Sequence, residues 1–315
     1  MITLAQMEYL IAVDKYGSFV EAAKNCFVTQ PTLSMQIQKL EKEIGALIFD
    51  RSKQPIVTTE IGRQIIEQTR IVLLETSKIQ EVVNSHSNII SGQLKIGIIP
   101  TVAPYLVPLF LEKFLEKYPK IEVSIDELQT RVIIDKLRKD EIDIAMLATP
   151  LNKNDLIEKP LYYEPFVGYV APSHRLYKKK KITAKDLSLA DMWVLNEGHC
   201  FRGQTLQICG DGEVIDNHML HFGSGNLGML KKLVERNFGM TLIPYLSALE
   251  VKKTSKSDML REFENPAPTR EISLVYRREY FKKNMINALE KVILSCLPED
   301  LKNQKHKTII DKFVY

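Results

Sequence analysis

The sequence lacks the apolar stretches that a membrane protein needs. No run in its 315 residues approaches the roughly 20 consecutive apolar side chains that cross a bilayer. The first residues, Met1–Tyr9, also lack the basic start and the apolar run of a secretory signal peptide. We therefore expect a cytoplasmic protein that has no membrane partner.

Cysteine is scarce, and its spacing excludes common kinds of site. A structural disulfide framework is not expected in a cytoplasmic chain of this length. His218 and His221 lie three residues apart, with no evident third ligand for a metal ion. The sequence thus predicts no metal site. The four cysteines, none of them in a C-x-x-C motif, are Cys26, Cys200, Cys209 and Cys296.

One glycine-rich segment resembles a nucleotide-binding motif but lacks its partner. Residues 223–228 fit G-x-G-x-x-G, which needs an acidic residue at the end of the next strand to bind a ribose. That strand, expected at Thr241–Ile243, runs into Pro244 and Tyr245 instead. We expect a loop that opens a helix at Leu227, and no cofactor.

Positive charge is not concentrated in the N-terminal part. Residues 1–90 contain nine Lys and Arg against ten Asp and Glu, a net charge of −1, although the whole chain carries +4. Bulk charge therefore gives no sign of DNA binding in this part. Such a function has to rest on the local pattern.

The local pattern of residues 1–58 predicts a winged helix-turn-helix. Capping residues at Thr3, Ser18 and Thr29 open three short helices, and residues 46–58 predict a two-stranded wing. The second helix of such a pair enters the major groove with its early residues. The same topology also serves protein–protein contacts, so the residues alone leave both uses open. The expected groove-facing residues are Gln30, Pro31, Thr32, Ser34 and Gln36.

Residues 59–88 predict one long helix, with no Gly or Pro after Gly62. Ile65, Val72 and Ile79 recur every seven residues, as in the seam of a coiled coil. A helix of this length between two domains favours a dimerising linker. The alternative is a helix that packs on its own domain.

From Gln93 onward, strands and helices alternate, which predicts parallel α/β architecture. The lysine-rich residues after Pro298 predict a poorly ordered or helical appendage. We expect strands at 93–99, 122–128, 142–147, 167–170, 193–195, 241–243 and 272–276, and helices at 104–118, 130–139, 227–236 and 284–297.

The N-terminal residues resemble the signature of LysR-type transcriptional regulators. The match includes Ala22-Ala23, residues 29–37, Leu40-Glu41, Gly45, Phe49-Asp50-Arg51, Thr58 and Gly62. The resemblance implies a homodimer or homotetramer that binds double-stranded promoter DNA and works with RNA polymerase. Met35 departs from the pattern, because many members carry Arg there. By the resemblance, the DNA contacts are Gln30, Pro31, Thr32, Ser34 and Arg51.

The segment from Gly198 to Cys209 carries the candidate chemistry. A thiol reacts with peroxide as the thiolate, and His199 and Arg202 are neighbours of the kind that favour the thiolate of Cys200. Oxidation gives a sulfenic acid, which a second thiol can capture as a disulfide. If residues 202–208 are helical, the two Cα atoms lie roughly 13 Å apart, whereas a disulfide needs about 4.4–6.8 Å. The bond then requires the segment to refold. The residues alone equally allow two buried, inert cysteines.

Within the LysR family, this segment resembles the peroxide-sensing OxyR group. The group shares the motif Gly-His-Cys-x-Arg-x-Gln and a second cysteine nine residues after the first, and residues 99–106, 129–130 and 270–277 match it too. The resemblance implies a redox-active Cys200–Cys209 disulfide, control of oxidative-stress genes as activator or repressor, and a thiol reductant such as a glutaredoxin or thioredoxin. Gly203 departs from the group, which carries an acidic residue there. The implied peroxide pocket consists of Thr101, Thr130, His199 and Arg270, with Arg270 stabilising negative charge.

Together these features predict a mixed α and α/β protein in four parts. A winged helix-turn-helix (1–58) and a linker helix (59–90) precede a periplasmic-binding-protein-like regulatory region, and a tail (298–315) follows. The region has two α/β subdomains, one of residues 91–163 and 268–297 and one of residues 164–267, which carries the redox cysteines. We expect a hydrogen-peroxide-sensing regulator that is not an enzyme. The rivals are a LysR-type regulator that binds a small organic effector and a thiol peroxidase.

Overall fold

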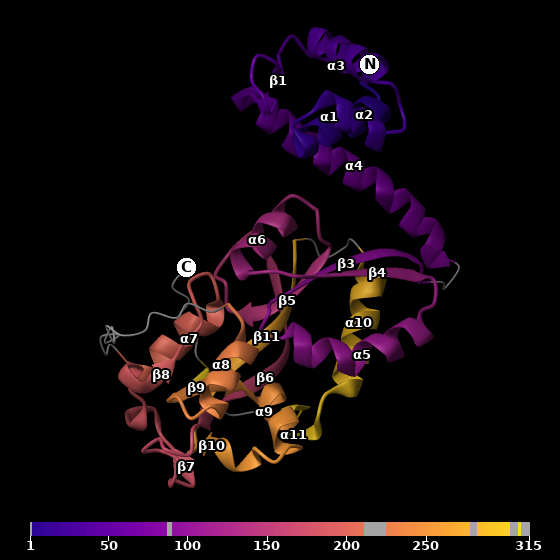
Figure 1. The fold of residues 1–315 in the computed structure, drawn as a ribbon. Coiled ribbons are helices and arrows are strands. Elements are labelled where there is room, and N and C mark those ends of the chain that lie inside the picture. Colours follow the sequence, from indigo (N-terminus) through magenta and orange to yellow (C-terminus); the bar gives the residue numbers. More distant parts are fainter. Residues whose placement is uncertain (1, 87–89, 211–224, 278–281, 303–307, 310–315) are drawn as a thin grey trace. The chain divides into compact units, whose positions relative to one another are not determined.

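The computed structural model describes residues 2–86, 90–210, 225–277, 282–302 and 308–309. The chain divides into two compact units, residues 1–89 and residues 90–315 (Figure 1). Within the described residues, no helix has the length and apolar character that would let it cross a membrane.

The N-terminal unit contains three short helices, a wing and one long helix. Thr3, Ser18 and Thr29 cap the three short helices, as predicted. Gly17 and Gly45 end the first and third helices with φ of 59° and 73°, a conformation that glycine adopts without steric cost. The predicted winged helix-turn-helix is therefore confirmed. Its elements are α1 (Leu4–Tyr16), α2 (Phe19–Asn25), α3 (Gln30–Ile44), β1 (Phe49–Asp50), β2 (Val57–Thr58) and α4 (Glu60–His86).

The third helix has one buried face and one exposed face. Leu33, Ile37 and Leu40 recur at helical spacing and are buried in a core that also contains Ala22 and Ala23 of α2. The small alanines let the two helices approach closely. Packing of this face leaves the opposite face of α3 at the surface.

The long helix α4 presents different environments along the predicted seam. Ile65 packs on the core of the N-terminal unit, as in the alternative interpretation of the helix. Val72 is half-buried, whereas Ile79 is 68% exposed. Residues 87–89 lie outside the described residues. The dimer seam stays a prediction.

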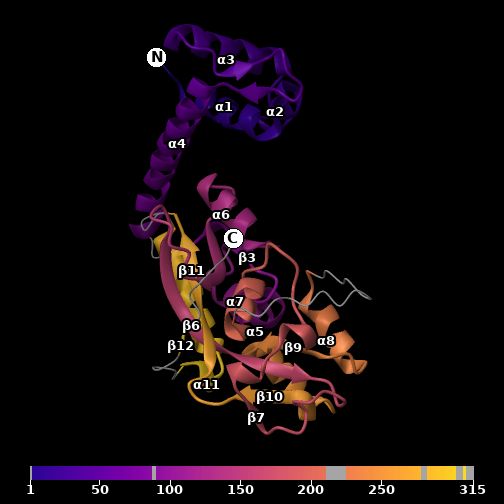
Figure 2. The same cartoon turned by 90° about the vertical axis from the view of Figure 1, so that its left-hand side faces the viewer.

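One sheet runs through the C-terminal unit in the strand order β4-β3-β5-β11-β6-β10-β7. Strand β3 is parallel to β4 and β5, as the alternating pattern predicts. Strand β11 is antiparallel to both β5 and β6, so the predicted parallel arrangement does not extend to this strand. Figure 2 shows β6 and β11 side by side. These strands are β3 (Gly92–Ile98), β4 (Ile121–Glu127), β5 (Ile144–Thr149), β6 (Ile157–Val170) and β11 (Pro268–Tyr276).

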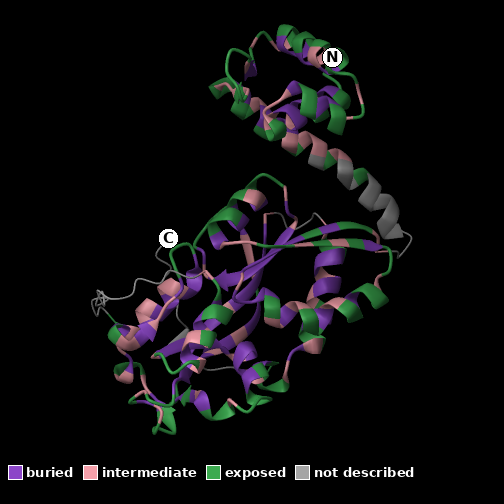
Figure 3. Ribbon diagram, in the orientation of Figure 1, coloured by how far each residue is buried: buried purple, intermediate pink, exposed green. Residues whose placement is uncertain are grey.

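Two hydrophobic cores form on this sheet, and β6 contributes to both. Tyr162 lies in the first core and Phe166 in the second, so the strand passes between them around Glu164. Helices α5 (Ala103–Lys117), α6 (Thr130–Arg138) and α10 (Lys283–Cys296) cover the first core. Figure 3 shows that buried residues line the central strands. The predicted subdomain boundaries at 163–164 and 267–268 stay predictions.

The second core contains elements that the sequence pattern revealed only in part. Helix α9 and strands β7 and β10 were not predicted, and β6 begins ten residues before the predicted strand. Strand β9 pairs with both β6 and β8. The elements are β7 (Lys181–Ile182), β8 (Met192–Trp193), α7 (Cys200–Cys209), α8 (Leu227–Glu235), β9 (Met240–Pro244), α9 (Tyr245–Lys252) and β10 (Leu260–Phe263).

The start of the tail is packed rather than detached. Helix α11 (Glu299–Lys302) places Leu301 in the first core, and the Tyr245 hydroxyl donates to Asp300 Oδ2 at 2.8 Å. Strand β12 (Thr308–Ile309) pairs with β11. Residues 303–307 and 310–315 lie outside the described residues.

Candidate functional site

The predicted DNA contacts gather at the start of α3 and on the wing. Gln30, Pro31 and Thr32 are exposed in the first turn of the helix, as a groove-facing role requires. Ser34 is half-buried. Gln36 is also half-buried, and its side-chain oxygen accepts a hydrogen bond from Gln6 at 3.2 Å. A contact between Gln36 and a base would therefore compete with an interaction inside the domain.

Arg51 is held by its own domain. Its Nη2 lies 2.8 Å from the buried carboxylate of Glu41, and its Nη1 donates to Ser34 Oγ at 3.4 Å. The guanidinium lies 4.8 Å from the centre of the Phe19 ring. Glu41 also accepts the Ile48 N–H at 2.9 Å, so the pair ties the wing to α3. The structure thus brings Ser34 and Arg51 together and gives Arg51 a structural role.

Two apolar side chains on the helix-turn-helix were not predicted as site residues. Phe27, in the turn before α3, is 96% exposed and has φ of 55°. Met35 is 59% exposed. Large apolar side chains in such positions suit contact with thymine methyl groups. Phe27 could have been identified from the sequence, because it lies in the turn of the predicted helix-turn-helix.

Cys200 begins α7 and lines a narrow pocket. Thr101 comes from the loop before α5 and Thr130 from the first residue of α6, both directly after a strand of the sheet. Three of the four predicted pocket residues therefore surround the thiol, while Arg270 is not part of the lining. The pocket is lined by Ile99, Pro100, Thr101, Gln129, Thr130, Gly198, His199, Cys200 and Phe201.

Gln129 is a pocket residue that the sequence reasoning missed. Its Nε2 lies 3.4 Å from His199 Nε2. Gly198 has φ of 90°, and a Cβ atom there would lie 2.6 Å from Gln129 Oε1, so glycine permits the close approach of the amide. Burial lowers the pKa of His199, which favours the neutral imidazole.

The thiol of Cys200 is buried, and this overturns the expected source of its reactivity. Burial raises the pKa of Cys200, against the opposing effects of the Arg270 charge and the Thr130 hydroxyl. Arg202 donates its Nη1 hydrogen to Leu195 O at 3.0 Å. The adjacent His199 is desolvated. Of the three basic residues expected to favour the thiolate, Arg270 is therefore the one whose charge does so.

Arg270 lies behind the pocket in a buried network. Its Nη1 donates to Thr101 Oγ1 at 2.8 Å, and its Nη2 donates to Thr101 O at 3.1 Å. Its Nε and Nη2 also bind Glu164 Oε2 at 3.0 and 2.7 Å. Since Thr101 Oγ1 accepts from Arg270, its own hydroxyl hydrogen is left to donate to another group. Both side chains of the Arg270–Glu164 pair are 1% exposed.

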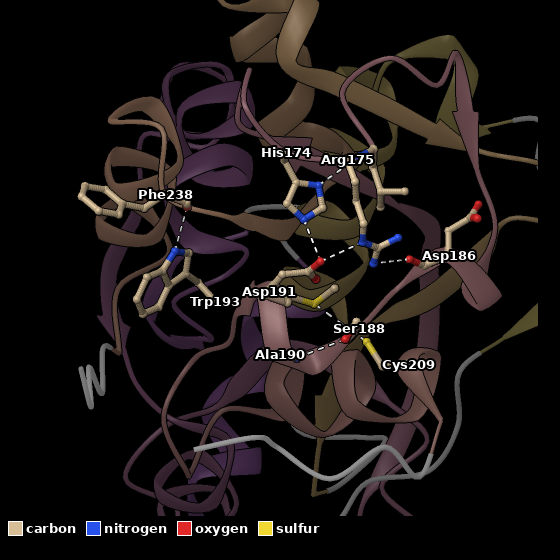
Figure 4. A network of polar contacts seen from close by, with 11 residues as sticks. His174, Arg175, Asp186, Ser188, Ala190, Asp191, Trp193, Cys209 and Phe238 are labelled. Atoms are coloured by element: carbon tan, nitrogen blue, oxygen red, sulfur yellow. Dashed lines mark hydrogen bonds and ion pairs between the residues drawn. The ribbon is translucent and has the colours of Figure 1, made fainter. Parts of the chain in front are cut away.

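Cys209 lies at the other end of α7 on a separate set of contacts (Figure 4). Its Sγ lies 3.8 Å from Met192 Sδ. Burial and the negative charge of Asp191 raise the pKa of Cys209 to about 11. Asp191 is bound by His174 and Arg175 at 3.0 and 2.9 Å. The second thiol is thus held protonated at neutral pH.

Both cysteines are free, and the helix between them keeps them apart. The ten-residue helix sets their Cα atoms roughly 13 Å apart at the normal helical rise. Gln204 and Thr205 are buried inside this helix, and their side-chain polar atoms have no hydrogen-bond partner among the described residues. Each such group costs about 1–3 kcal/mol. Among the described residues, nothing offsets the desolvation of these polar groups in α7.

The described part of the chain holds no group of three or more His, Cys, Asp or Glu residues that could bind a metal ion. His218 and His221, the two histidines that lack an evident third metal ligand, lie outside the described residues. Gly223 and Ser224 of the glycine-rich segment lie outside them too. Gly225 lies near His199, because a Cβ atom there would be 3.1 Å from Nε2. Gly225 thus adjoins the Cys200 pocket.

Two families match the chain. "Bacterial regulatory helix-turn-helix protein, lysR family" matches residues 4–63, and "LysR substrate binding domain" matches residues 88–295. The "Hydrogen peroxide-inducible genes activator" of Haemophilus influenzae is 34% identical over 276 residues, which cover 88% of this chain and 91% of that protein.

Solved structures agree with this relationship. A full-length OxyR variant from Pseudomonas aeruginosa has a TM-score of 0.79 and 30% identity, and the match covers 94% of this chain and 99% of that one. An H2O2-bound OxyR cysteine mutant from Corynebacterium glutamicum has a TM-score of 0.61 and 26% identity, with 93% and 92% of the two chains covered. The chain therefore belongs to the LysR family of bacterial helix-turn-helix regulators, and within it to the OxyR group.

Proposed function

We propose that this protein senses hydrogen peroxide at Cys200 and converts the signal into a change in promoter binding. Two threonine hydroxyls, Thr101 and Thr130, lie in the Cys200 pocket, where they can hydrogen-bond a peroxide molecule. The names of the relatives point to the same signal. The observation that carries the proposal is the position of Cys200 and Cys209 at opposite ends of one helix, in which the buried Gln204 and Thr205 lack hydrogen-bond partners among the described residues.

The chemistry proceeds in two balanced steps. The Cys200 thiolate attacks one oxygen of the peroxide, so an S–O bond forms, the O–O bond breaks and hydroxide leaves as water after taking up a proton. The sulfur is oxidised and the peroxide is reduced. Cys209 then loses its proton and attacks the sulfenic sulfur, so an S–S bond forms and the S–O bond breaks, and the leaving hydroxide takes up a proton to become a second water molecule.

The second step requires α7 to unfold. The Cα atoms have to approach from roughly 13 Å to about 4.4–6.8 Å, which a straight helix does not allow. Unfolding exposes the unpaired polar atoms of Gln204 and Thr205 to new partners. A covalent bond between two residues thus becomes a rearrangement of the second core, and through it a change in DNA binding.

The remaining partners belong to the same proposal. The helix-turn-helix binds double-stranded promoter DNA as a homodimer or homotetramer joined through α4, in the cytoplasm. RNA polymerase receives the output, with activation or repression depending on the promoter. A glutaredoxin or thioredoxin returns the disulfide to two thiols.

The decisive experiment maps the disulfide in the full chain. Mass spectrometry before and after a short peroxide pulse should find a Cys200–Cys209 bond only after the pulse. Promoter occupancy, measured in the same samples, should change with the fraction of this bond. A promoter response that occurs without oxidation of Cys200 would refute peroxide sensing at this residue and favour a regulator that binds an organic effector. Continuous peroxide consumption with a thiol reductant would instead indicate a peroxidase.

A further inference from the structure

Glu164 is a buried carboxylate that the proposed peroxide chemistry does not use. It lies on β6, where the strand passes from the first core to the second, and its side chain is 1% exposed. Its Oε1 accepts the Leu246 N–H of α9 at 2.9 Å, while its Oε2 accepts both hydrogen bonds from Arg270. Glu164, Arg270 and Leu246 all lie in the interior, where an unbalanced charge costs more free energy than at the surface.

The buried charges beside the pocket are balanced while the thiol keeps its proton. Glu164 is negative, Arg270 is positive, and a protonated Cys200 adds nothing. Ionisation of Cys200 would leave one net negative charge in the interior, which burial penalises. Without the carboxylate, Arg270 and a Cys200 thiolate would balance each other instead.

Arg270 is also mechanically fixed by Glu164. The two bonds to Oε2 hold the guanidinium 5.2 Å from the centre of the Phe201 ring and against Thr101. Phe201 follows Cys200 directly in α7. The carboxylate therefore controls both the position and the effective charge of Arg270, the cation whose charge favours the Cys200 thiolate.

We propose that Glu164 is a positioning residue that keeps Cys200 a protonated, slow-reacting thiol at rest by compensating the charge of Arg270. The proposal rests on the proposed function, because peroxide chemistry at Cys200 gives this restraint its purpose. Of the described residues, the neutral His199 and two tyrosines are further titratable groups beside the site. These tyrosines, Tyr105 and Tyr162, have pKa values raised by burial, and neither faces the thiol as a charge.

The test measures how readily Cys200 ionises, without peroxide. Iodoacetamide alkylates the thiolate, and peptide mapping of the full chain reports its rate at Cys200 as a function of pH. In Glu164→Gln, the midpoint of this profile should fall by about one to three pH units, so alkylation at pH 7 should be about tenfold faster or more. In Arg270→Gln, the midpoint should rise. In the double variant, it should return towards that of the parent.

Glu158→Gln is the matched control, because Glu158 lies on the same strand and accepts the Leu151 N–H at 3.0 Å. Its profile at Cys200 should equal that of the parent. A purely structural role of Glu164 would change the rate at every pH and leave the midpoint in place, which would overturn the proposal. If Glu164→Gln does not fold, Arg270→Gln is compared with the double variant. The double variant should have the lower midpoint, and equal midpoints would again overturn the proposal.

The two proposals fail separately. An unchanged midpoint in Glu164→Gln, with a normal Cys200–Cys209 disulfide after peroxide, would refute the role of Glu164 alone. A shifted midpoint without any disulfide in the parent would leave the role of Glu164 intact and refute peroxide sensing by this pair.

Discussion

Glu41 and Arg51 form an ion pair of 2.8 Å in which the carboxylate is almost completely buried and the guanidinium is partly exposed. The pair joins α3 to the wing, and its exposed part lies beside the first residues of the helix that is expected in the DNA groove. Arg51 thus stabilises the domain, and its contact with a DNA phosphate stays a prediction. The two roles can be separated by experiment.

Arg51→Ala should lower both stability and DNA affinity. The free energy of unfolding should fall by about 1–3 kcal/mol, because the buried Glu41 carboxylate loses a charged partner. At a temperature where the variant is folded, the slope of log K against log salt should decrease by about one unit if Arg51 contacts a phosphate. Lys53→Ala, at an exposed wing residue, is the control and should leave stability unchanged. Equal unfolding temperatures for Arg51→Ala and the parent would contradict the structural role.

Cys200→Ser and Cys209→Ser should both lack the disulfide but differ in chemistry. A hydroxyl at position 200 forms no sulfenic acid, so peroxide should no longer change promoter occupancy. Cys209→Ser should still be oxidised at Cys200 and then stall as sulfenic acid or over-oxidise. Mass spectrometry of the modified peptides distinguishes the two states. Cys26→Ser and Cys296→Ser should respond like the parent, and a loss of response in either would show that other thiols take part.

Asp191→Asn should make Cys209 ionise at lower pH. The pKa of Cys209 is raised to about 11 by burial and by the Asp191 charge, so removal of that charge should move the alkylation midpoint of Cys209 downward. Asp186→Asn is a control, because the Asp186 carboxylate binds Lys179, while Arg175 binds the main-chain oxygen of Asp186. The profile of Cys209 should be unchanged in that variant. An equal midpoint in Asp191→Asn and the parent would leave burial as the sole cause.

Gln204→Leu should stabilise the reduced helix. The substitution removes a buried amide that has no hydrogen-bond partner among the described residues, a gain of about 1–3 kcal/mol. A more stable dithiol form makes the disulfide easier to reduce, so the potential of the pair should become more positive by about 20–65 mV. Equilibration with glutathione buffers measures this shift. Gln207→Leu, at a half-buried position of the same helix, is the control and should change the potential little. A shift of equal size in this control would show that the effect does not come from the buried amide of Gln204.

Ile79→Asp should weaken self-association without unfolding the N-terminal unit. Ile79 is largely exposed, and its burial against a partner chain would contribute about 1.5–3 kcal/mol. Sedimentation should therefore show at least about tenfold weaker dimerisation, with lower operator affinity. Ile71→Asp, one residue off the seam on the same helix, should affect dimerisation less. A normal dimer in Ile79→Asp would favour the packing of α4 on its own domain alone.

Local signals made the N-terminal unit predictable. Thr3, Ser18 and Thr29 cap their helices through residues three positions away, and Gly17 and Gly45 end helices by their own conformation. Each of these interactions acts within one turn of chain. The order of the helices and the wing could therefore be predicted from the sequence.

The electrostatics of the Cys200 pocket could not be predicted in this way. The sequence placed His199 and Arg202 beside the thiol, but burial neutralises the first and a backbone carbonyl binds the second. The cation that favours the thiolate is Arg270, whose partner Glu164 is 106 residues away in the chain. The antiparallel pairing of β11 with β6 brings Arg270 and Glu164 together. No local sequence pattern predicts this pairing of distant strands.

For the proposed peroxide chemistry at Cys200, Gly198 would also bear on which oxidants reach the sulfur. Its missing side chain lets Gln129 close over the pocket beside His199. Hydrogen peroxide, with two oxygen atoms, would displace this amide less than a larger oxidant on its way to the threonine hydroxyls. A hydroperoxide with a bulky alkyl group has to push Gln129 aside and break its contact with the imidazole. In the proposed sensor, discrimination between small and large oxidants would thus depend on a residue that has no side chain.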